Sequence, residues 1–290
     1  MIKKTDHSNG WILASPAILI LSIVGLIPLL TVINYSFFDI FILDKRYWIG
    51  LEWYQELMQS PRFWASLGRS LLFSTCILAI QLPLGILIAL AIPKRGIWVP
   101  ICLMTMSVPL LIPWNVIPII WLNYLRLDTG FLGQFLSFFG LDFDWKFNPI
   151  HTWLALILMD VWHWTSLVIL LAYSSLSTIP TAYYQAAAID RASRWQIFRY
   201  IELPKMSGIL LMAILLRFMD SLMIYTEAFG INSGGPQNAT LFLGIDLGEQ
   251  IKAFDYGPSA ARSVIYFIII LFIVWAFKTA LNHQKSGGTR

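Results

Sequence analysis

The fold is decided by residues 184–204, which read Tyr-Gln-Ala-Ala-Ala-Ile-Asp-Arg-Ala-Ser-Arg-Trp-Gln-Ile-Phe-Arg-Tyr-Ile-Glu-Leu-Pro. This polar, helix-forming stretch lies between two very apolar segments. Pro180 suits the first turn of a helix, where its missing N–H costs nothing. Ser193 and Gln196 fit a capping box that starts a second short helix through Tyr200, and Pro204 is expected to end that helix. The pattern predicts two short helices joined near residues 190–192, which form either a compact surface that a partner can bind or an ordinary amphipathic connector.

The rest of the chain is strongly apolar. Hydrophobic residues make up 58% of the 290 residues and charged residues only 12%, about half the charged fraction of a typical globular domain. Sparsely charged runs cover residues 11–38, 70–92, 96–125, 149–180, 206–233 and 263–277. A membrane helix needs roughly 20 such residues, and the short last run can be extended through Ala260 and Ala261. We therefore predict an all-α membrane protein with six transmembrane helices in one domain, residues 1–290.

Charged residues are distributed unevenly between the two sides of this predicted membrane domain. With both termini inside, the inner segments hold eleven basic and three acidic residues, and the outer segments hold eight basic and ten acidic ones. The inner basic residues are Lys3, Lys4, Lys94, Arg95, Arg191, Arg194, Arg199, Lys205, Lys278, Lys285 and Arg290. Basic residues favour the cytoplasmic side. We expect a multi-pass protein in the lipid of a bacterial-type cytoplasmic (inner) membrane, with both termini and the 177–205 loop in the cytoplasm.

The chain carries no recognisable catalytic, metal or nucleotide site. Cys76 and Cys102 lie in predicted spans, and the four histidines are scattered without metal-ligand spacing. No phosphate-binding G-x-x-x-x-G-K-[ST] motif occurs, and no basic patch suggests nucleic acid. We expect no catalytic residue, no metal and no cofactor in this chain, which is not an enzyme. ATP and Mg, if they drive transport, would be bound by a partner ATPase.

Two patterns resemble a known family. Residues 185–204 are similar to the Glu-Ala-Ala-x-x-x-Gly coupling motif of ABC importer permeases, which is followed by Leu-Pro. The segment from Ser233-Gly-Gly-Pro236 to Ala260-Ala-Arg-Ser263 resembles the first permease of carbohydrate-type importers, the group that includes the maltose and glycerol-phosphate systems. The family Glu is Gln185 here and the family Gly is Arg191, which replaces a residue suited to a tight turn. By this resemblance the chain is the weaker-matching half of an asymmetric pair.

The resemblance implies a set of partners. Loop 177–205, called the coupling loop below, would contact an ATPase through Gln185, Ala186, Ala187, Asp190, Arg191, Ala192, Phe198, Leu203 and Pro204. The assembly would hold a second permease subunit, two ATP-binding subunits and an extracytoplasmic substrate-binding protein that meets the outer loop, residues 230–261. In that loop we expect a helix within residues 240–254, with Leu241, Ile245 and Ile251 inward. Alternatively, the loop is a lid that packs on its own spans.

Ionisable residues inside predicted spans usually face a partner or a wet cavity. Residues 217, 220, 224 and 227 are spaced to share one helical face, so Arg217 and Asp220 can pair. Such a pair can line a pathway or merely fix helix packing, and Glu227 can simply be solvated near the outer end. Carboxylates accept hydrogen bonds from sugar hydroxyls, and aromatic faces cover the C–H face of a sugar. The expected substrate pathway consists of Asp160, Trp164, Arg217, Asp220, Tyr225 and Glu227.

Three intramembrane acidic groups against one arginine favour a neutral sugar or polyol over an anion. We expect the permease subunit of an ATP-driven, binding-protein-dependent importer that forms half of the translocation pathway. The alternative is a secondary transporter in which Asp160 or Glu227 binds a coupling ion, although the usual inverted repeat is not evident.

Overall fold

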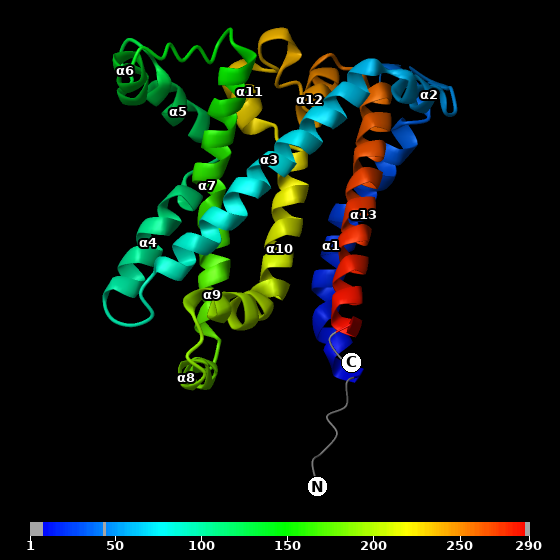
Figure 1. The fold of residues 1–290 in the computed structure, drawn as a ribbon. Helices are drawn as coiled ribbons and strands as arrows, with labels where there is room; N and C mark the ends of the chain where they lie inside the picture. The colour runs from blue at the N-terminus through cyan, green and yellow to red at the C-terminus, as the bar shows by residue number, and fades with distance from the viewer. Residues whose placement is uncertain (1–7, 43–44, 288–290) are drawn as a thin grey trace. The chain divides into compact units, whose positions relative to one another are not determined.

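Helices dominate the chain in this computed structural model, which describes residues 8–42 and 45–287 (Figure 1). Contacts between Cα atoms divide the chain into two units. The first unit consists of Met1–Pro61 and Leu247–Ile269, and the second of Arg62–Asp246 and Ile270–Arg290. Each unit is described by itself.

The first unit contains a β-hairpin that the all-α prediction missed. Its elements are α1 (Ser8–Tyr35), β1 (Phe38–Ile42), β2 (Lys45–Trp48), α2 (Glu52–Gln59) and the beginning of α13 (Tyr256–Gly287). The strands pair antiparallel, with Phe38 opposite Trp48, and the register shifts between Ile40 and Ile42. Aromatic and β-branched residues favour such strands, but each strand is too short to stand out beside a long apolar helix.

Gly257, at the beginning of α13, allows a close approach to the hairpin. A Cβ atom at this position would lie 2.4 Å from the Phe38 carbonyl oxygen and 2.6 Å from Trp53 Nε1. Trp53 Nε1 itself donates to the Phe38 carbonyl at 3.1 Å. The backbone therefore needs a residue without a side chain here.

The second unit consists mainly of helices that pack around α7. Its elements are α3 (Pro61–Ala91), α4 (Trp98–Leu111), α5 (Ile117–Leu125), α6 (Phe131–Phe138), α7 (Pro149–Ser177), α8 (Thr181–Ile189), α9 (Arg194–Ile197), the π-helical turn η1 (Phe198–Glu202), α10 (Leu203–Leu222), α11 (Thr226–Asn232), the 3-10 turn η2 (Pro236–Asn238) and α12 (Leu243–Lys252), which continues into the first unit. Both α4 and α10 pack along α7. The larger core cluster includes Phe73, Ile77, Leu156 and Met159, all fully buried.

Five helical segments of the described chain are long and apolar enough to cross a membrane, judged by length and composition: Ala14–Tyr35, Pro61–Ala91, Pro149–Ser177, Arg194–Asn232 and Tyr256–Thr279. The continuous helix predicted over residues 96–125 is wrong, because α4 ends at Leu111 and α5 begins at Ile117. Ile112 is extended, with ψ 130°, as expected for a residue that precedes a proline. The count of six membrane helices stays a prediction.

The helix predicted over residues 206–233 is also interrupted, because α10 ends at Leu222 and α11 begins at Thr226. Arg217 and Asp220 therefore lie on α10, whereas Ile224 and Glu227 do not, and the single helical face expected for all four is wrong. A Cβ atom on Gly244 would lie 2.7 Å from the Ile224 carbonyl oxygen. The outer loop therefore covers the break. Backbone that is not helical is tolerated inside a membrane only where protein or water surrounds it.

The outer loop packs on α3, in agreement with the lid alternative. Leu241 and Ile245 are buried, but Ile251 is 50% exposed, so its predicted inward position is wrong. Arg62 Nε lies 2.6 Å from Asp246 Oδ1, and Arg69 Nε donates to the Leu241 carbonyl oxygen at 3.0 Å. These contacts bind the loop to the first turns of α3.

Candidate functional site

The coupling loop is ordered and begins with α8, at the opposite end of α7 and α10 from α11 (Figure 1). Pro180 is the residue before the helix rather than part of its first turn. After Ile189 the helix closes in a Schellman motif: Ala192 N–H donates to the Ala187 carbonyl at 2.9 Å, and Arg191 N–H donates to Ala188 at 3.2 Å. Arg191 consequently has φ +50°, a conformation that favours glycine.

The second part of the coupling loop begins with the predicted capping box. Ser193 N–H donates to Gln196 Oε1 at 2.7 Å, and Gln196 N–H donates to Ser193 Oγ at 3.3 Å. Pro204 does not end the following helix, contrary to the prediction, but lies in the first turn of α10. The preceding turn η1 is π-helical, with Leu203 N–H bonded to the Phe198 carbonyl. This wider turn accommodates the missing N–H of Pro204, since π-turns change the hydrogen-bond register.

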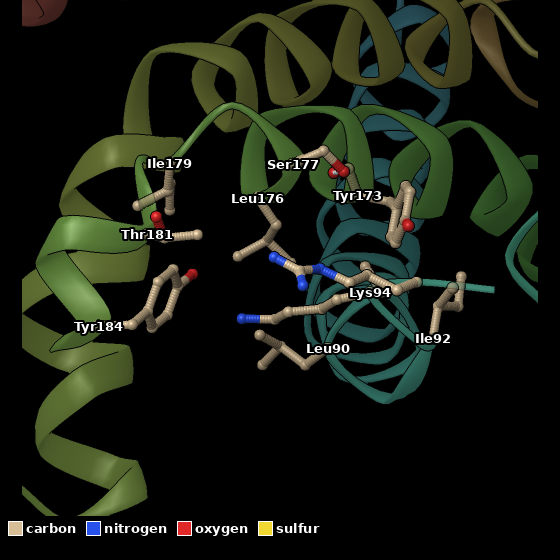
Figure 2. A pocket seen from close by; sticks show the side chains of 11 residues that line it. Leu90, Ile92, Lys94, Tyr173, Leu176, Ser177, Ile179, Thr181 and Tyr184 are labelled. Carbon is tan, nitrogen blue, oxygen red and sulfur yellow. Dashed lines mark hydrogen bonds between the residues drawn. The ribbon is translucent and has the colours of Figure 1, made fainter. Parts of the chain in front are cut away.

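Glu202 links the parts of the coupling loop, a role that the sequence did not indicate. Its side chain is fully buried and accepts from Arg194 Nη1 at 2.6 Å and from Tyr184 Oη at 3.2 Å. Lys94, in the connection between α3 and α4, approaches to 3.8 Å and also lies 3.8 Å from the Tyr184 ring centroid, facing it in Figure 2. Burial and the nearby Glu202 carboxylate raise the pKa of Tyr184 to about 12. Tyr184 therefore remains a hydrogen-bond donor at neutral pH.

The residues predicted to contact an ATPase differ in exposure. Gln185, Ala186, Asp190, Arg191, Leu203 and Pro204 are exposed, Ala192 and Phe198 are half-buried, and Ala187 is buried against its own chain. Three large apolar side chains that the prediction omitted, Ile189, Trp195 and Tyr200, are 64–82% exposed. An exposed apolar set of this kind indicates a contact surface. They lie on three different elements, α8, α9 and η1, so no single helical period in the sequence could have grouped them.

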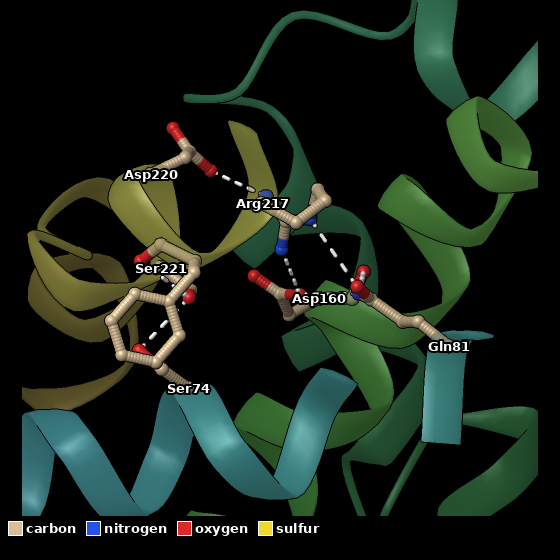
Figure 3. Close-up of polar contacts among 7 residues, drawn as sticks. Ser74, Gln81, Asp160, Arg217, Asp220 and Ser221 are labelled. Carbon is tan, nitrogen blue, oxygen red and sulfur yellow. Dashed lines mark hydrogen bonds and ion pairs between the residues drawn. The ribbon is translucent and has the colours of Figure 1, made fainter. Parts of the chain in front are cut away.

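A second polar site centres on Arg217, whose side chain is fully buried among α3, α7 and α10 (Figure 3). Its Nη1 lies 2.5 Å from Asp220 Oδ2, and its Nη2 lies 2.5 Å from Asp160 Oδ1. Its Nε donates to Gln81 Oε1 at 3.2 Å, and Gln81 Nε2 donates to Asp160 Oδ1 at 2.6 Å. The predicted Arg217–Asp220 pair is confirmed. The bonds to Asp160 and Gln81 were missed because they join residues far apart in the chain.

The Arg217 cluster has one more negative than positive charge when its two carboxylates are ionised. An isolated buried guanidinium would be very unfavourable, and here each of its three nitrogens donates to a carboxylate or an amide oxygen. Asp160 is only 2% exposed, whereas the Asp220 side chain is 40% exposed. The excess negative charge is therefore accessible at Asp220.

Five of the six predicted pathway residues line one cavity of about 120 Å³, namely Asp160, Trp164, Asp220, Tyr225 and Glu227, together with Trp114, Met223, Ile224 and Thr226. The sixth, Arg217, lies behind this wall, with its Cζ 4.4 Å from the Trp164 ring centroid. The helix break at residues 223–225 contributes directly to the lining. Carboxylate oxygens and aromatic rings thus meet at one place, as the sequence predicted.

Glu227 belongs to the cavity rather than to the solvent. Its residue is 7% exposed, so the alternative in which it is simply solvated is wrong. Trp114, which the prediction did not include, lies 5.8 Å from Trp164 between ring centroids and adds a second aromatic side chain. Over residues 8–42 and 45–287, no group of three His, Cys, Asp or Glu residues is arranged to hold a metal ion.

Comparison with protein families identifies a match over most of the chain. A family described as "Binding-protein-dependent transport system inner membrane component" matches residues 81–283. The trehalose/maltose transport system permease protein MalF of Thermococcus litoralis is 26% identical over 276 residues, covering 93% of this chain and 92% of the relative. The lactose transport system permease protein LacF of Rhizobium radiobacter is 23% identical over 282 residues, covering 95% and 94%.

A solved structure shares the fold. A chain of a bacterial ABC transporter involved in the import of the acidic polysaccharide alginate aligns with a TM-score of 0.81 at 21% identity, covering 97% of this chain and 96% of that chain. The same kind of transporter in complex with an alginate-bound periplasmic protein aligns with a TM-score of 0.78 at 19% identity, covering 92% and 91%.

Proposed function

The chain belongs to the family of binding-protein-dependent transport system inner membrane components, and on this premise we propose that it is the permease subunit of an ATP-driven importer for a neutral sugar or polyol. The substrate class is supported by the relatives, which include permeases named for trehalose and maltose and for lactose. These relatives are matched over nearly their whole length.

The cavity beside Arg217 carries the proposal of a neutral substrate. Its walls present Asp160, Asp220 and Glu227, while the guanidinium of Arg217 is fully buried and bonded to two carboxylates. An anionic substrate would meet carboxylates without a free cation, and like charges repel strongly where water is excluded. A neutral hydroxyl donates to the same oxygens, and Trp114 and Trp164 offer faces for its C–H groups.

The proposed assembly supplies what this chain lacks. A second permease would complete the pathway, two ATP-binding subunits would hold ATP and Mg, and a substrate-binding protein would deliver the sugar on the extracytoplasmic side. The basic residues of loop 177–205 and of both termini support a cytoplasmic position for these segments. ATP-driven closure of the ATPases would move α8 and α9 and open the cavity to the other side. The family match gives no support to the alternative of a stand-alone ion-coupled transporter.

Transport by the reconstituted assembly tests this function. The chain and the products of its neighbouring genes are purified together, placed in liposomes with the binding protein, and supplied with labelled neutral sugars, polyols, uronates and sugar phosphates. We expect ATP-dependent uptake of a neutral compound only. Uptake of an anion, or ion-driven uptake by this chain alone, would contradict the proposal.

A matched pair of tryptophan variants tests the cavity as the pathway. Trp164→Ala removes an aromatic side chain that lines the cavity. We expect the KM for uptake to rise about threefold to tenfold, because an aromatic contact contributes roughly 0.5–1.5 kcal/mol to binding. Trp162→Ala is the control, because Trp162 lies against Trp121, 5.9 Å between ring centroids, and outside this cavity. If both variants changed the KM equally, the cavity would not be the substrate pathway.

A further inference from the structure

A separate cavity of about 250 Å³ lies at the end of the second unit that carries the coupling loop (Figure 2). It opens where two membrane-spanning helices finish, since α3 ends at Ala91 and α7 ends at Ser177. The beginning of α8 closes one side through Thr181 and Tyr184. The proposed transport cycle assigns no ligand to this cavity.

The lining of the cavity combines two kinds of side chain. Apolar ones come from Ala89, Leu90, Ile92, Leu176 and Ile179, and polar or cationic ones from Lys94, Arg95, Tyr173, Ser177, Thr181 and Tyr184. The two kinds lie next to one another around the cavity, with Ile179 near Thr181 and Leu176 near Ser177 (Figure 2). Apolar side chains together with two cations, at the end of membrane helices, match the acyl and phosphate parts of an anionic phospholipid.

The two basic residues are not equivalent. Lys94 lies 3.8 Å from the buried carboxylate of Glu202 and over the Tyr184 ring. Arg95 forms no hydrogen bond or ion pair with the described residues 8–42 and 45–287. Its guanidinium carries several donors that fit phosphate oxygens, so it is the group available to an incoming anion. Glu202 is compensated by Arg194 at 2.6 Å, which leaves the lining positively charged.

We propose that this cavity binds the phosphate group of an anionic phospholipid, with Arg95 as its principal contact and an acyl chain against Leu90, Leu176 and Ile179. Basic pockets between the ends of membrane helices suit such headgroups. The bound lipid would lie directly against α8 and so bias the position of the coupling loop. The proposal does not depend on which sugar is transported.

Lipid binding to the purified assembly tests the proposal. The assembly is delipidated in detergent and titrated with phosphatidylglycerol or with phosphatidylcholine, and bound lipid is counted by native mass spectrometry. We expect phosphatidylglycerol to bind more tightly. Arg95→Gln should weaken phosphatidylglycerol binding about fivefold, the contribution of one basic residue near a charged lipid. Arg95→Lys, which keeps the charge, should restore most of the affinity.

Arg199→Gln is the control, because Arg199 is an exposed basic residue of the coupling loop that does not line the cavity. The proposal is overturned if Arg95→Gln and Arg199→Gln bind phosphatidylglycerol equally. It is also overturned if inorganic phosphate displaces the lipid, since the site would then take free phosphate. Loss of the ATPase subunit from the Arg95→Gln assembly, with unchanged lipid binding, would instead assign Arg95 to the ATPase contact.

Discussion

Arg217 illustrates how a buried charge can be structural and still belong to a pathway. Its bond to Asp160 lies entirely inside the protein, whereas its bond to Asp220 reaches the cavity, because Asp220 is 40% exposed. Asp160 and Gln81 come from two other helices, so the guanidinium joins α3, α7 and α10. The packing alternative for Arg217 and the pathway assignment for Asp220 are therefore compatible.

Removal of Arg217 should destabilise the chain strongly. In Arg217→Met the buried Asp160 carboxylate loses its cation, and breaking a buried pair in this way costs about 3–5 kcal/mol. The double variant Arg217→Met/Asp160→Leu removes both charges and should recover most of the loss. Reversible unfolding in mixed micelles measures both variants. An Arg217→Met variant as stable as the parent would show that the buried pair contributes nothing.

The left-handed residue of the coupling loop offers a stabilising change. Arg191 has φ +50°, and a residue with a Cβ atom in this region costs about 1 kcal/mol relative to glycine. Arg191→Gly should therefore slow hydrogen exchange of the amides in α8 about fivefold, read by mass spectrometry on peptides from residues 181–192. Arg191→Ala is the control, since it removes the charge but keeps the Cβ. If Arg191→Ala slows hydrogen exchange in α8 as much as Arg191→Gly does, the removed charge and not the relieved backbone strain stabilises the helix.

At the scale of elements, Glu202 connects the coupling loop to the helix ends. It accepts from Tyr184 on α8 and from Arg194 on α9, and it lies near Lys94 before α4. Its own side chain is fully buried, while those of Arg194 and Lys94 are 56% and 62% exposed. Solvent weakens the attraction at the exposed ends, but the buried carboxylate still requires its donors.

Glu202→Gln should loosen α8 and α9 together. The amide keeps the shape but not the charge, and we expect a loss of about 1 kcal/mol, less than for a fully buried charged bond because both cations are solvated. Amide exchange over residues 181–202 should accelerate about fivefold, and ATP hydrolysis by the assembly should become less dependent on substrate. Asp190→Asn is the control, an exposed carboxylate of the same loop. Faster exchange confined to α8 would refute the role of Glu202 as a link.

Local signals in the sequence predicted elements well when the deciding contacts were close in the chain. The capping box of Ser193 and Gln196 is such a case, and so is α7, which begins at Pro149 as predicted. The break before Pro113 follows an equally local rule, but the apolar run masked it. The break after Leu222 packs closely against Gly244 of the outer loop, a contact that no local pattern contains.

At the scale of the whole molecule, composition was sufficient to predict a membrane protein but not the contacts that build the cavity beside Arg217. The three carboxylates of the cavity, Asp160, Asp220 and Glu227, were predicted together because ionisable groups in apolar runs are few. Their connections were not, since Gln81, Asp160 and Arg217 come from three separate spans. The exposed surface of α8 and α9 was predicted as a motif, but Ile189, Trp195 and Tyr200 emerge only when the chain is folded.

Orientation in the membrane is the last prediction, because it belongs to the chain as a whole. Cys76 and Cys102 are replaced by serine, and single cysteines are introduced as Ala186→Cys on α8 or Asp142→Cys before α7, both exposed positions. The distribution of basic residues predicts that loop 177–205 lies in the cytoplasm. In intact cells a membrane-impermeant maleimide should therefore label Asp142→Cys and not Ala186→Cys, and permeabilisation should make both reactive. The reverse pattern would put the coupling loop outside, where it could not meet an ATPase, and the proposed mechanism would be untenable.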